Sequence, residues 1–456
     1  QNYRSTTHIL GAASGLIDVN QGRLGKTLWT AEQGGEKVAI NAVWDGRAEA
    51  RAIGEIVEEL QRKKQHLSEM AVLVRAGFQT REFEENFLTL GLSYRIIGGV
   101  RFYERAEIRD AMAYLRVIQN PDDALAFERI INVPKRGIGD ATVQKLHLIA
   151  RAGETSLMSA ARDIVETEEL SKKARASLKT LISSFDRWRE MSPDISHMDL
   201  TDTVLEESGY YDKWKTDKSP DAPGKLDNLS ELIRGMESFE DLAEFLEHVS
   251  LVMDTTANDK TDYISIMTLH GSKGLEYDTI FLPGWEEELF PSKRSIDENG
   301  EKGLEEERRL AYVGITRAKK RAYIFYAASR YMFGNYTSPI PSRFIAELPE
   351  EHTVRHGQQG LSSTDQSNYN PSPSLGFNFG EGRENYQLDR SKTKKRSSSG
   401  RGANKKPAPS EFSVGERVFH DKFGYGEVSS IDGNKLMIEF EMGSSRKVMD
   451  SFIKPA

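Results

Sequence analysis

Two groups of short apolar runs constrain the fold of this chain more than any other feature. They occupy residues 38–40, 71–74 and 94–97 in the first group, and residues 263–267, 279–282 and 323–326 in the second. Such runs predict strands buried on both faces, as in a parallel sheet covered by helices. Between the first two runs, Ile53, Ile56, Val57 and Leu60 follow the spacing of one helix face. Strand–helix–strand units, and therefore an α/β fold, are expected.

Residues 105–260 separate the two groups and carry helical rather than strand periodicity. The repeating apolar positions are Ile108, Met112, Leu115 and Ile118, and later Leu242, Phe245, Leu246 and Val249. Each set marks one face of an amphipathic helix. We therefore predict a single parallel-sheet domain, residues 1–100 and 261–350, interrupted by an all-α insertion at 101–260.

The composition changes after residue 350. Residues 351–410 are rich in Ser, Gly, Asn and Pro, and residues 390–406 carry eight cations and no acidic residue. This predicts a disordered basic linker. A β pattern follows at Val414, Val418, Val428 and 436–440, with a turn expected at Gly424–Gly426. Residues 411–456 are predicted to form a small β-barrel of the SH3 or Tudor kind.

Composition excludes several classes of protein. The chain has 456 residues, no cysteine, and 62 basic against 70 acidic residues, a net charge of −8. Without cysteine there is no disulfide scaffold, thiolate metal site or cysteine nucleophile, which suits a reducing cytoplasm. No apolar run reaches the length of a membrane helix. The net charge alone argues against nucleic-acid binding, but the basic linker shows that the total conceals local clusters.

A glycine-rich segment resembles a phosphate loop but does not satisfy the motif. Residues 22–27 read GRLGKT, with two residues between the glycines where four are needed, and Asn20 stands where a glycine belongs. A surface turn is the simpler interpretation. No apolar strand ends in the Asp-Glu pair that holds magnesium, so we expect no complete nucleotide site, and no metal site, in this chain alone.

Three other segments carry residues suited to phosphate chemistry. Residues 1–5 read QNYRS, residues 268–276 read TLHGSKGLE after an apolar strand, and residues 305–318 end in YVGITRA. Taken singly, each has an ordinary explanation: a surface Arg–Tyr pair, a strand–helix loop, and a helix whose charges complement its dipole. An arginine nevertheless presents a rigid fork to phosphate oxygens.

Together and in this order, the three segments resemble motifs of the UvrD/PcrA/Rep-type superfamily one DNA helicases. Residues 94–105 (YRIIGGVRFYER) and 132–139 (NVPKRGIG) agree with the same family. The resemblance covers residues 1–350, and the terminal barrel is similar to the Tudor-like module of UvrD and PcrA. It implies that the interrupted domain is the second of two RecA-like domains. The first, with the phosphate loop and magnesium ligands, is expected upstream of Gln1.

The resemblance also implies roles for individual residues. Tyr3 would stack on adenine, Arg4 and Arg317 would reach the γ-phosphate as arginine fingers, and Glu276 would bind the ribose. Thr268, His270 and Lys273 would lie beside nucleotide and single-stranded DNA.

Two further segments are expected to contact duplex DNA. The segment formed by Lys135, Arg136, Gly137, Ile138 and Gly139 resembles a helix–hairpin–helix turn, although a plain helix–helix turn would read similarly. Phe333 would stack on the terminal base pair, with a buried core aromatic as the alternative.

The implied protein is an ATP-dependent 3′–5′ DNA helicase that uses ATP with Mg²⁺ and acts in repair or replication, in the cytoplasm at the nucleoid. This chain alone is expected to be inactive. The alternatives are a non-catalytic remnant that binds DNA, RNA polymerase or repair proteins, and a recombination helicase of the RecB/AddA kind. The latter is disfavoured because acidic nuclease motifs are missing and the small barrel is present.

Overall fold

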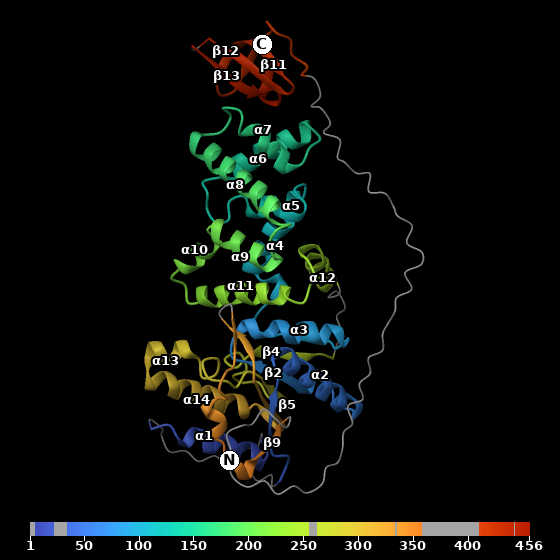
Figure 1. Cartoon of the computed structure of the whole chain (residues 1–456), viewed down its shortest axis with the longest axis vertical. Coiled ribbons are helices and arrows are strands. Elements are labelled where there is room, and N and C mark those ends of the chain that lie inside the picture. Colours follow the sequence, from blue (N-terminus) through green and yellow to red (C-terminus); the bar gives the residue numbers. More distant parts are fainter. Residues whose placement is uncertain (1–4, 22–33, 255–261, 333–334, 358–409, 442) are drawn as a thin grey trace, which may run out of the picture. The chain divides into compact units, whose positions relative to one another are not determined.

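The structure is a computed structural model that describes residues 5–21, 34–254, 262–332, 335–357, 410–441 and 443–456. The chain divides into two compact units, residues 1–361 and 362–456 (Figure 1). The glycine-rich segment 22–27 lies outside the described residues.

A seven-stranded sheet forms the base of the first unit. Its strand order is β3-β4-β2-β5-β6-β1-β9, and every neighbouring pair is parallel. The strands are β1 (Val38–Val43), β2 (Met70–Val74), β3 (Tyr94–Ile96), β4 (Ile264–Thr268), β5 (Tyr277–Leu282), β6 (Ala318–Ala327) and β9 (Thr353–Gly357). All six predicted apolar runs are confirmed as strands. Because β4 lies between β3 and β2, the two groups interleave in one sheet, which fits the RecA-like prediction.

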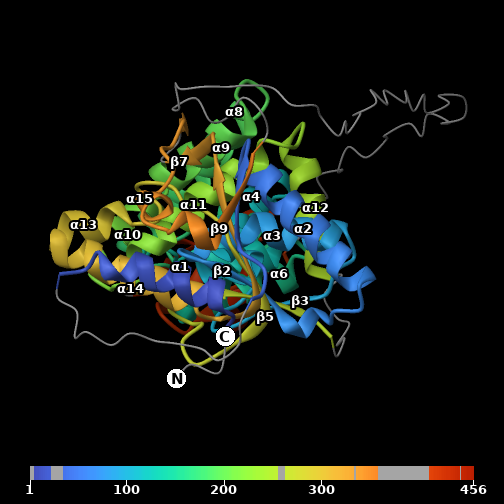
Figure 2. The ribbon, with the colours of Figure 1, turned by 90° about the horizontal axis from the view of Figure 1, so that it is seen from below.

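Helices cover both faces of this sheet (Figure 2). They are α1 (Thr7–Asp18), α2 (Gly46–Arg62), α3 (Thr80–Thr89), α13 (Lys293–Asn299), α14 (Glu301–Ile315) and α15 (Arg343–Ala346). Ala71 and Leu73 of β2 pack with α1 and α14 in one core, whereas Val72 and Val74 pack with α2 and α3 in another. Successive residues point to opposite faces of a strand, so an uninterrupted apolar run supplies both cores.

The insertion between β3 and β4 is helical throughout its described part. Its helices are α4 (Ala106–Gln119), α5 (Ala124–Ile130), α6 (Asp140–Ala152), α7 (Leu157–Ile164), α8 (Lys172–Met191), α9 (His197–Glu207), α10 (Tyr210–Lys215), α11 (Ala222–Met236) and α12 (Leu242–Asp254). The predicted face of α4 is buried at all four positions. Tyr114 packs between Phe185, Trp188 and Tyr210 with ring centroids about 6 Å apart.

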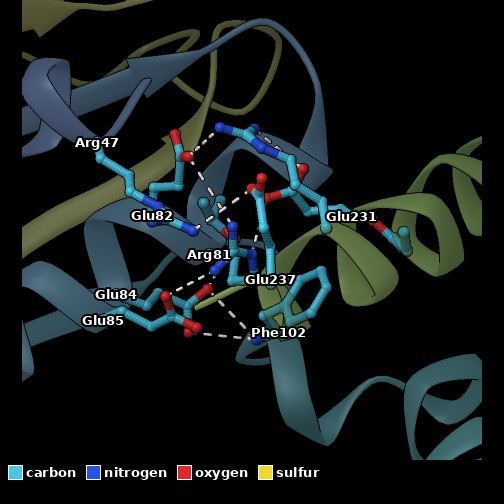
Figure 3. A network of polar contacts seen from close by, with 12 residues as sticks. Arg47, Arg81, Glu82, Glu84, Glu85, Phe102, Glu231 and Glu237 are labelled. Carbon is cyan, nitrogen blue, oxygen red and sulfur yellow. Dashed lines mark hydrogen bonds and ion pairs between the residues drawn. The ribbon is translucent and has the colours of Figure 1, made fainter. Parts of the chain in front are cut away.

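Buried charges join the insertion to the sheet domain (Figure 3). Arg81 of α3 is 2% exposed; its Nε donates to Glu231 of α11 at 2.7 Å and its Nη1 to Glu85 at 2.6 Å. Arg234 of α11 pairs in return with Glu82 of α3. The two helices therefore exchange arginines and glutamates in both directions.

The predicted linker begins too early. Residues 353–357 form β9, which pairs with β1 at the edge of the sheet in the register Val38↔Thr353. Its sequence resembles a linker because it contains only one aliphatic residue, and an edge strand can remain polar since one side faces solvent. Residues 358–409 lie outside the described part of the chain.

The second unit is a five-stranded antiparallel sheet in the order β13-β12-β11-β10-β14. Its strands are β10 (Arg417–His420), β11 (Gly424–Asp432), β12 (Lys435–Phe440), β13 (Ser444–Met449) and β14 (Ile453–Pro455). Two further strands, β7 (Arg330–Met332) and β8 (Asn335–Thr337), belong to the first unit and form a separate hairpin. The turn predicted at Gly424–Gly426 is wrong, because these residues begin β11. A side chain on Gly426 would lie 2.6 Å from Ile438, so this glycine serves close packing rather than turning.

Candidate nucleotide and DNA-binding site

Three segments that are far apart in the sequence meet at the amino ends of β5 and β6. The buried Ser5 hydroxyl donates to the carbonyl of Ala318 at 2.7 Å, and the Thr6 amide to that of Lys319 at 3.3 Å. The Tyr277 amide donates to the carbonyl of Arg317 at 3.0 Å. These hydrogen bonds bring together Ser5, Tyr277, which directly follows the segment 268–276, and Arg317. Tyr3 and Arg4 lie outside the described residues and directly precede Ser5 in the sequence.

Arg317 follows the carboxyl end of α14 and is 8% exposed. Its Nε donates to the carbonyl of Val313 at 3.1 Å, and its Nη1 donates to that of Leu275 at 3.0 Å. The guanidinium is therefore bonded to Leu275, the residue that precedes Glu276 in the sequence. The Glu276 carboxylate pairs with Lys319 Nζ at 3.1 Å, with both side chains well exposed to solvent.

The loop after β4 places the next predicted residues at the opposite, carboxyl edge of the sheet. Thr268 is the last residue of β4, and its hydroxyl accepts from the Gly271 amide at 3.2 Å. His270 and Lys273 are exposed in the loop that follows. Thr268 and His270 therefore lie at the carboxyl end of β4, while Lys273 and Glu276 belong to the connection that leads to β5.

Arg75 is a neighbour of this loop that the sequence reasoning missed. It follows the last residue of β2 and forms two hydrogen bonds with Glu307 of α14, at 2.8 and 2.7 Å. Partial desolvation and the positive charge of Arg75 lower the pKa of His270. Its position directly after an apolar strand is the signal that could have identified it, because parallel strands end at a common edge.

The glycine turn of the insertion divides its five predicted residues into two kinds. Arg136 holds the turn together: its Nη1 donates to the carbonyls of Ile130 and Val133 at 3.0 and 2.9 Å, and its Nη2 donates to the Tyr114 hydroxyl at 2.6 Å. Ile138 is 1% exposed.

The remaining members of the turn face outward. Lys135, Gly137 and Gly139 are exposed, and Gly137 has a φ of 76°. Gly139 precedes α6 at its N-cap position, and no described atom lies within 4 Å of where its Cβ would be. Open glycines at a helix N-terminus leave backbone N–H groups accessible to phosphate.

The hairpin that follows β6 carries the last predicted contact. Strands β7 and β8 pair antiparallel in the register Arg330↔Thr337. Phe333 lies outside the described residues. Among the residues that the structure describes, no group of three or more His, Asp or Glu could hold a metal ion, and no helix is long and apolar enough to span a membrane. A magnesium site is therefore assigned to none of the described residues.

Comparison with known proteins identifies the class. Residues 1–329 match the model of the UvrD-like helicase C-terminal domain, most of the chain. The chain therefore belongs to the UvrD-like DNA helicase family and corresponds to its C-terminal portion.

Individual relatives agree with this family assignment. The chain is 48% identical over 359 residues to the "Probable DNA helicase II homolog" of Rickettsia felis, covering 78% of this chain and 55% of the relative. It is 35% identical over 455 residues to DNA helicase II of Escherichia coli, and 35% identical over 451 residues to the ATP-dependent DNA helicase PcrA of Staphylococcus epidermidis. Each of these two alignments covers 97% of this chain and 59% of the relative. The chain thus spans little more than half the length of these relatives.

Proposed function

We propose that this chain is the C-terminal portion of an ATP-dependent helicase that moves 3′ to 5′ along single-stranded DNA and unwinds duplex DNA. The meeting of Ser5, Tyr277 and Arg317 carries this proposal. A nucleotide bound beside them would contact all three family segments at once, although Ser5 and its partner Ala318 are 313 positions apart in the sequence.

The residues at the amino ends of β5 and β6 would act on the phosphates and the nucleoside. Arg4 and Arg317 would neutralise the charge that spreads over the phosphoryl oxygens in the transition state. Tyr3 would stack on adenine. The Glu276 carboxylate would accept a hydrogen bond from the ribose in place of its ion pair with Lys319. Breaking this ion pair costs little, because exposed ion pairs contribute at most about 1 kcal/mol.

An upstream RecA-like domain would supply the phosphate loop and the Mg²⁺ ligands. The arginines would then contact ATP only when the two domains close, so that ATP hydrolysis is coupled to domain motion.

DNA would bind at the loop after β4 and at the glycine turn of the insertion. Thr268, His270 and Lys273 would contact single-stranded DNA, with His270 in its neutral form because its pKa is lowered. Gly137 and Gly139 would offer backbone N–H groups to a duplex phosphate, and Lys135 would add sequence-independent attraction. The buried side chain of Ile138 and the internal hydrogen bonds of Arg136 suit these two residues to shaping the turn.

The decisive experiment compares ATP turnover by residues 1–456 with turnover by the longer protein that includes the upstream segment. We expect background turnover from the chain alone. We expect single-stranded DNA to stimulate turnover by the longer protein, and unwinding of a duplex with a 3′ tail but not of one with a 5′ tail. DNA-stimulated turnover by residues 1–456 alone would contradict the two-domain site, and an inactive longer protein would favour a non-catalytic remnant.

A second, compatible role is recruitment of a protein partner, such as RNA polymerase, by the C-terminal unit. This unit has a core of its own, formed by Val418, Val428, Leu436, Ile438, Phe440, Val448 and Ile453. We interpret it as the family's Tudor-like module. A pull-down with residues 410–456 tests this role. If deleting the unit abolishes capture but not unwinding, the two functions are separate; if it only weakens DNA binding with a smaller salt dependence, the basic linker contacts DNA.

A further inference from the structure

The hairpin β7–β8 forms a two-stranded sheet that is separate from the seven-stranded sheet (orange in Figure 1). It follows the carboxyl end of β6 after two connecting residues, Ala328 and Ser329, whose amides donate to the carbonyls of Val43 and Trp44 at 2.9 and 2.8 Å. An isolated two-stranded hairpin is only marginally stable in water. Its direction therefore depends on the residues that hold its two ends: the chain after β8 is held by the Glu287 amide, which donates to the carbonyl of Ile340 at 2.9 Å, and the first end is held at residue 330.

That residue is Arg330, which is 4% exposed and lies between two buried carboxylates. Its Nη2 donates to Glu49 Oε2 at 2.9 Å and to Glu286 Oε1 at 2.8 Å, and its Nε lies 2.7 Å from Glu286 Oε2. Glu49 is 1% exposed and Glu286 fully buried. Arg330, Glu49 and Glu286 together form the hairpin anchor.

Both carboxylates are tied in turn to the sheet domain. Glu286 Oε1 accepts from the Ala327 amide, the last residue of β6, at 2.6 Å. Glu49 Oε1 accepts from the Gly284 amide, just beyond β5, at 2.9 Å. Glu49 itself lies in the first turn of α2. The hairpin anchor therefore connects the first hairpin residue to α2 and to the carboxyl ends of two central strands.

Burying these charges is not the cheapest way to stabilise a fold. Replacing a buried ion pair by apolar residues of similar volume is often neutral or stabilising, because each charge must be desolvated. What an arginine between two carboxylates provides is direction, since its planar fork fixes the orientation of the bonded groups. A hydrophobic contact at the same place would permit the hairpin to pivot.

We propose that Arg330, held by Glu49 and Glu286, is a positioning residue that fixes the direction of the β7–β8 hairpin so that domain movement is transmitted to strand separation. This inference rests on the proposed helicase function for its consequence, but the rigid attachment can be tested without it. No catalytic contact is assigned to the hairpin anchor.

The first test measures hydrogen exchange in residues 1–456. In Arg330→Met we expect the exchange of amides of residues 330–337 to rise at least about tenfold relative to the amides of β1 and β6, because local opening of the hairpin becomes easier in addition to any loss of global stability. The matched control is Arg343→Met, which removes an exposed pair with Glu287 beside the same loop. If Arg330→Met does not fold, the charge-free triple variant Glu49→Gln, Glu286→Gln, Arg330→Met leaves no unpaired buried charge. Unchanged hairpin exchange in a folded variant would overturn the proposal.

The second test uses the longer protein and separates ATP turnover from unwinding. We expect Arg330→Met and the triple variant to keep DNA-stimulated ATP turnover within about twofold while unwinding of a tailed duplex falls about tenfold or more, as misplaced groups do. Equal losses of both activities, or unwinding that does not fall, would overturn the positioning role. Failure of the unsubstituted longer protein to turn over ATP would instead overturn the proposed function, and the hydrogen-exchange result would still decide the rigid attachment.

Discussion

The two ends of β6 are held to their surroundings in different ways. At the amino end, Ser5 and Tyr277 attach the candidate nucleotide site through hydrogen bonds that end on the carbonyls of Ala318 and Arg317. At the carboxyl end, Arg330 attaches the hairpin through the side chains of Glu49 and Glu286, all three buried. A main-chain carbonyl remains as an acceptor when the side chain of its residue is substituted. A buried charge that loses its partner, in contrast, retains its full desolvation cost without compensation.

This difference teaches where variants should affect chemistry and where they should affect structure. Substitutions at the amino end should alter ATP turnover more than folding. Substitutions at the carboxyl end should alter local structure and pH dependence more than the chemical step.

The largest effect is expected for Arg317→Ala in the longer protein. ATP turnover should fall by about a thousandfold or more, because an arginine finger stabilises the transition state, while nucleotide binding largely survives. Steady-state ATP hydrolysis and nucleotide titration measure the two quantities. Arg309→Ala, on the helix α14 that precedes Arg317 and paired with Glu305 and Glu306, is the control. A loss below about tenfold would contradict the role assigned to Arg317.

Arg330→Met should lower the free energy of unfolding of the first unit by about 3–5 kcal/mol, because two buried carboxylates lose their partner. Urea denaturation of residues 1–456 measures this change. The charge-free triple variant should recover most of the loss. If Arg330→Met were as stable as the original chain, the ion pairs of Arg330 with Glu49 and Glu286 would contribute little to stability.

The hairpin anchor should also make stability depend on pH. Burial raises the pKa of Glu49 from 4.5 to about 7, with Arg330 opposing the shift and Glu286 adding to it. Since the pKa of Glu49 is higher in the folded state than in the unfolded state, protonation of Glu49 favours the folded state. Its contribution to the free energy of unfolding is complete below about pH 4.5 and is lost as the pH rises through about 7.

We therefore expect Glu49→Gln to reduce the fall in unfolding free energy between about pH 5 and 8 by about 2 kcal/mol. Part of the fall should remain, because burial also raises the pKa of Glu84 to about 7. Urea titrations at several pH values measure the slope. The same slope in Glu49→Gln and in the original chain would refute the assignment to Glu49.

The smallest effect is expected at the amino end. Ser5→Ala removes the hydrogen bond to the Ala318 carbonyl and should lower the free energy of unfolding by about 1 kcal/mol. Ser184→Ala, whose hydroxyl bonds Thr180 on an exposed helix face, should change it by much less. A loss at Ser5 as large as that of Arg330→Met would remove the contrast between the two ends of β6.

The sequence predicted the strands well because an uninterrupted apolar run such as 71–74 needs cover on both faces. It also predicted the helical insertion, since the buried face of α4 repeats at helical spacing. It did not predict α1, although Ile9, Ala13 and Leu16 share one buried face. It missed β9 because an edge strand carries little apolar pattern.

Within the candidate site, the sequence supplied segments but not their contacts. The motifs around Ser5, Glu276 and Arg317 were recognisable from residue type and order. Arg75 and Glu307, Arg330 and Glu49, and Arg81 and Glu231 were not, because their partners are 150 or more residues away. Nothing in a local pattern distinguishes an arginine that will be buried from one that will be solvated.

What the sequence determined by itself is the alternation of buried strands and amphipathic helices, the family segments and their order, since these depend on local periodicity and residue type. Only the tertiary structure decided which distant charges meet. The parallel sheet brings residues 5, 277 and 317 to one end of β6 and residues 49, 286 and 330 to the other. An ion pair or a hydrogen bond requires a distance, and the folded chain alone sets distances between residues so far apart.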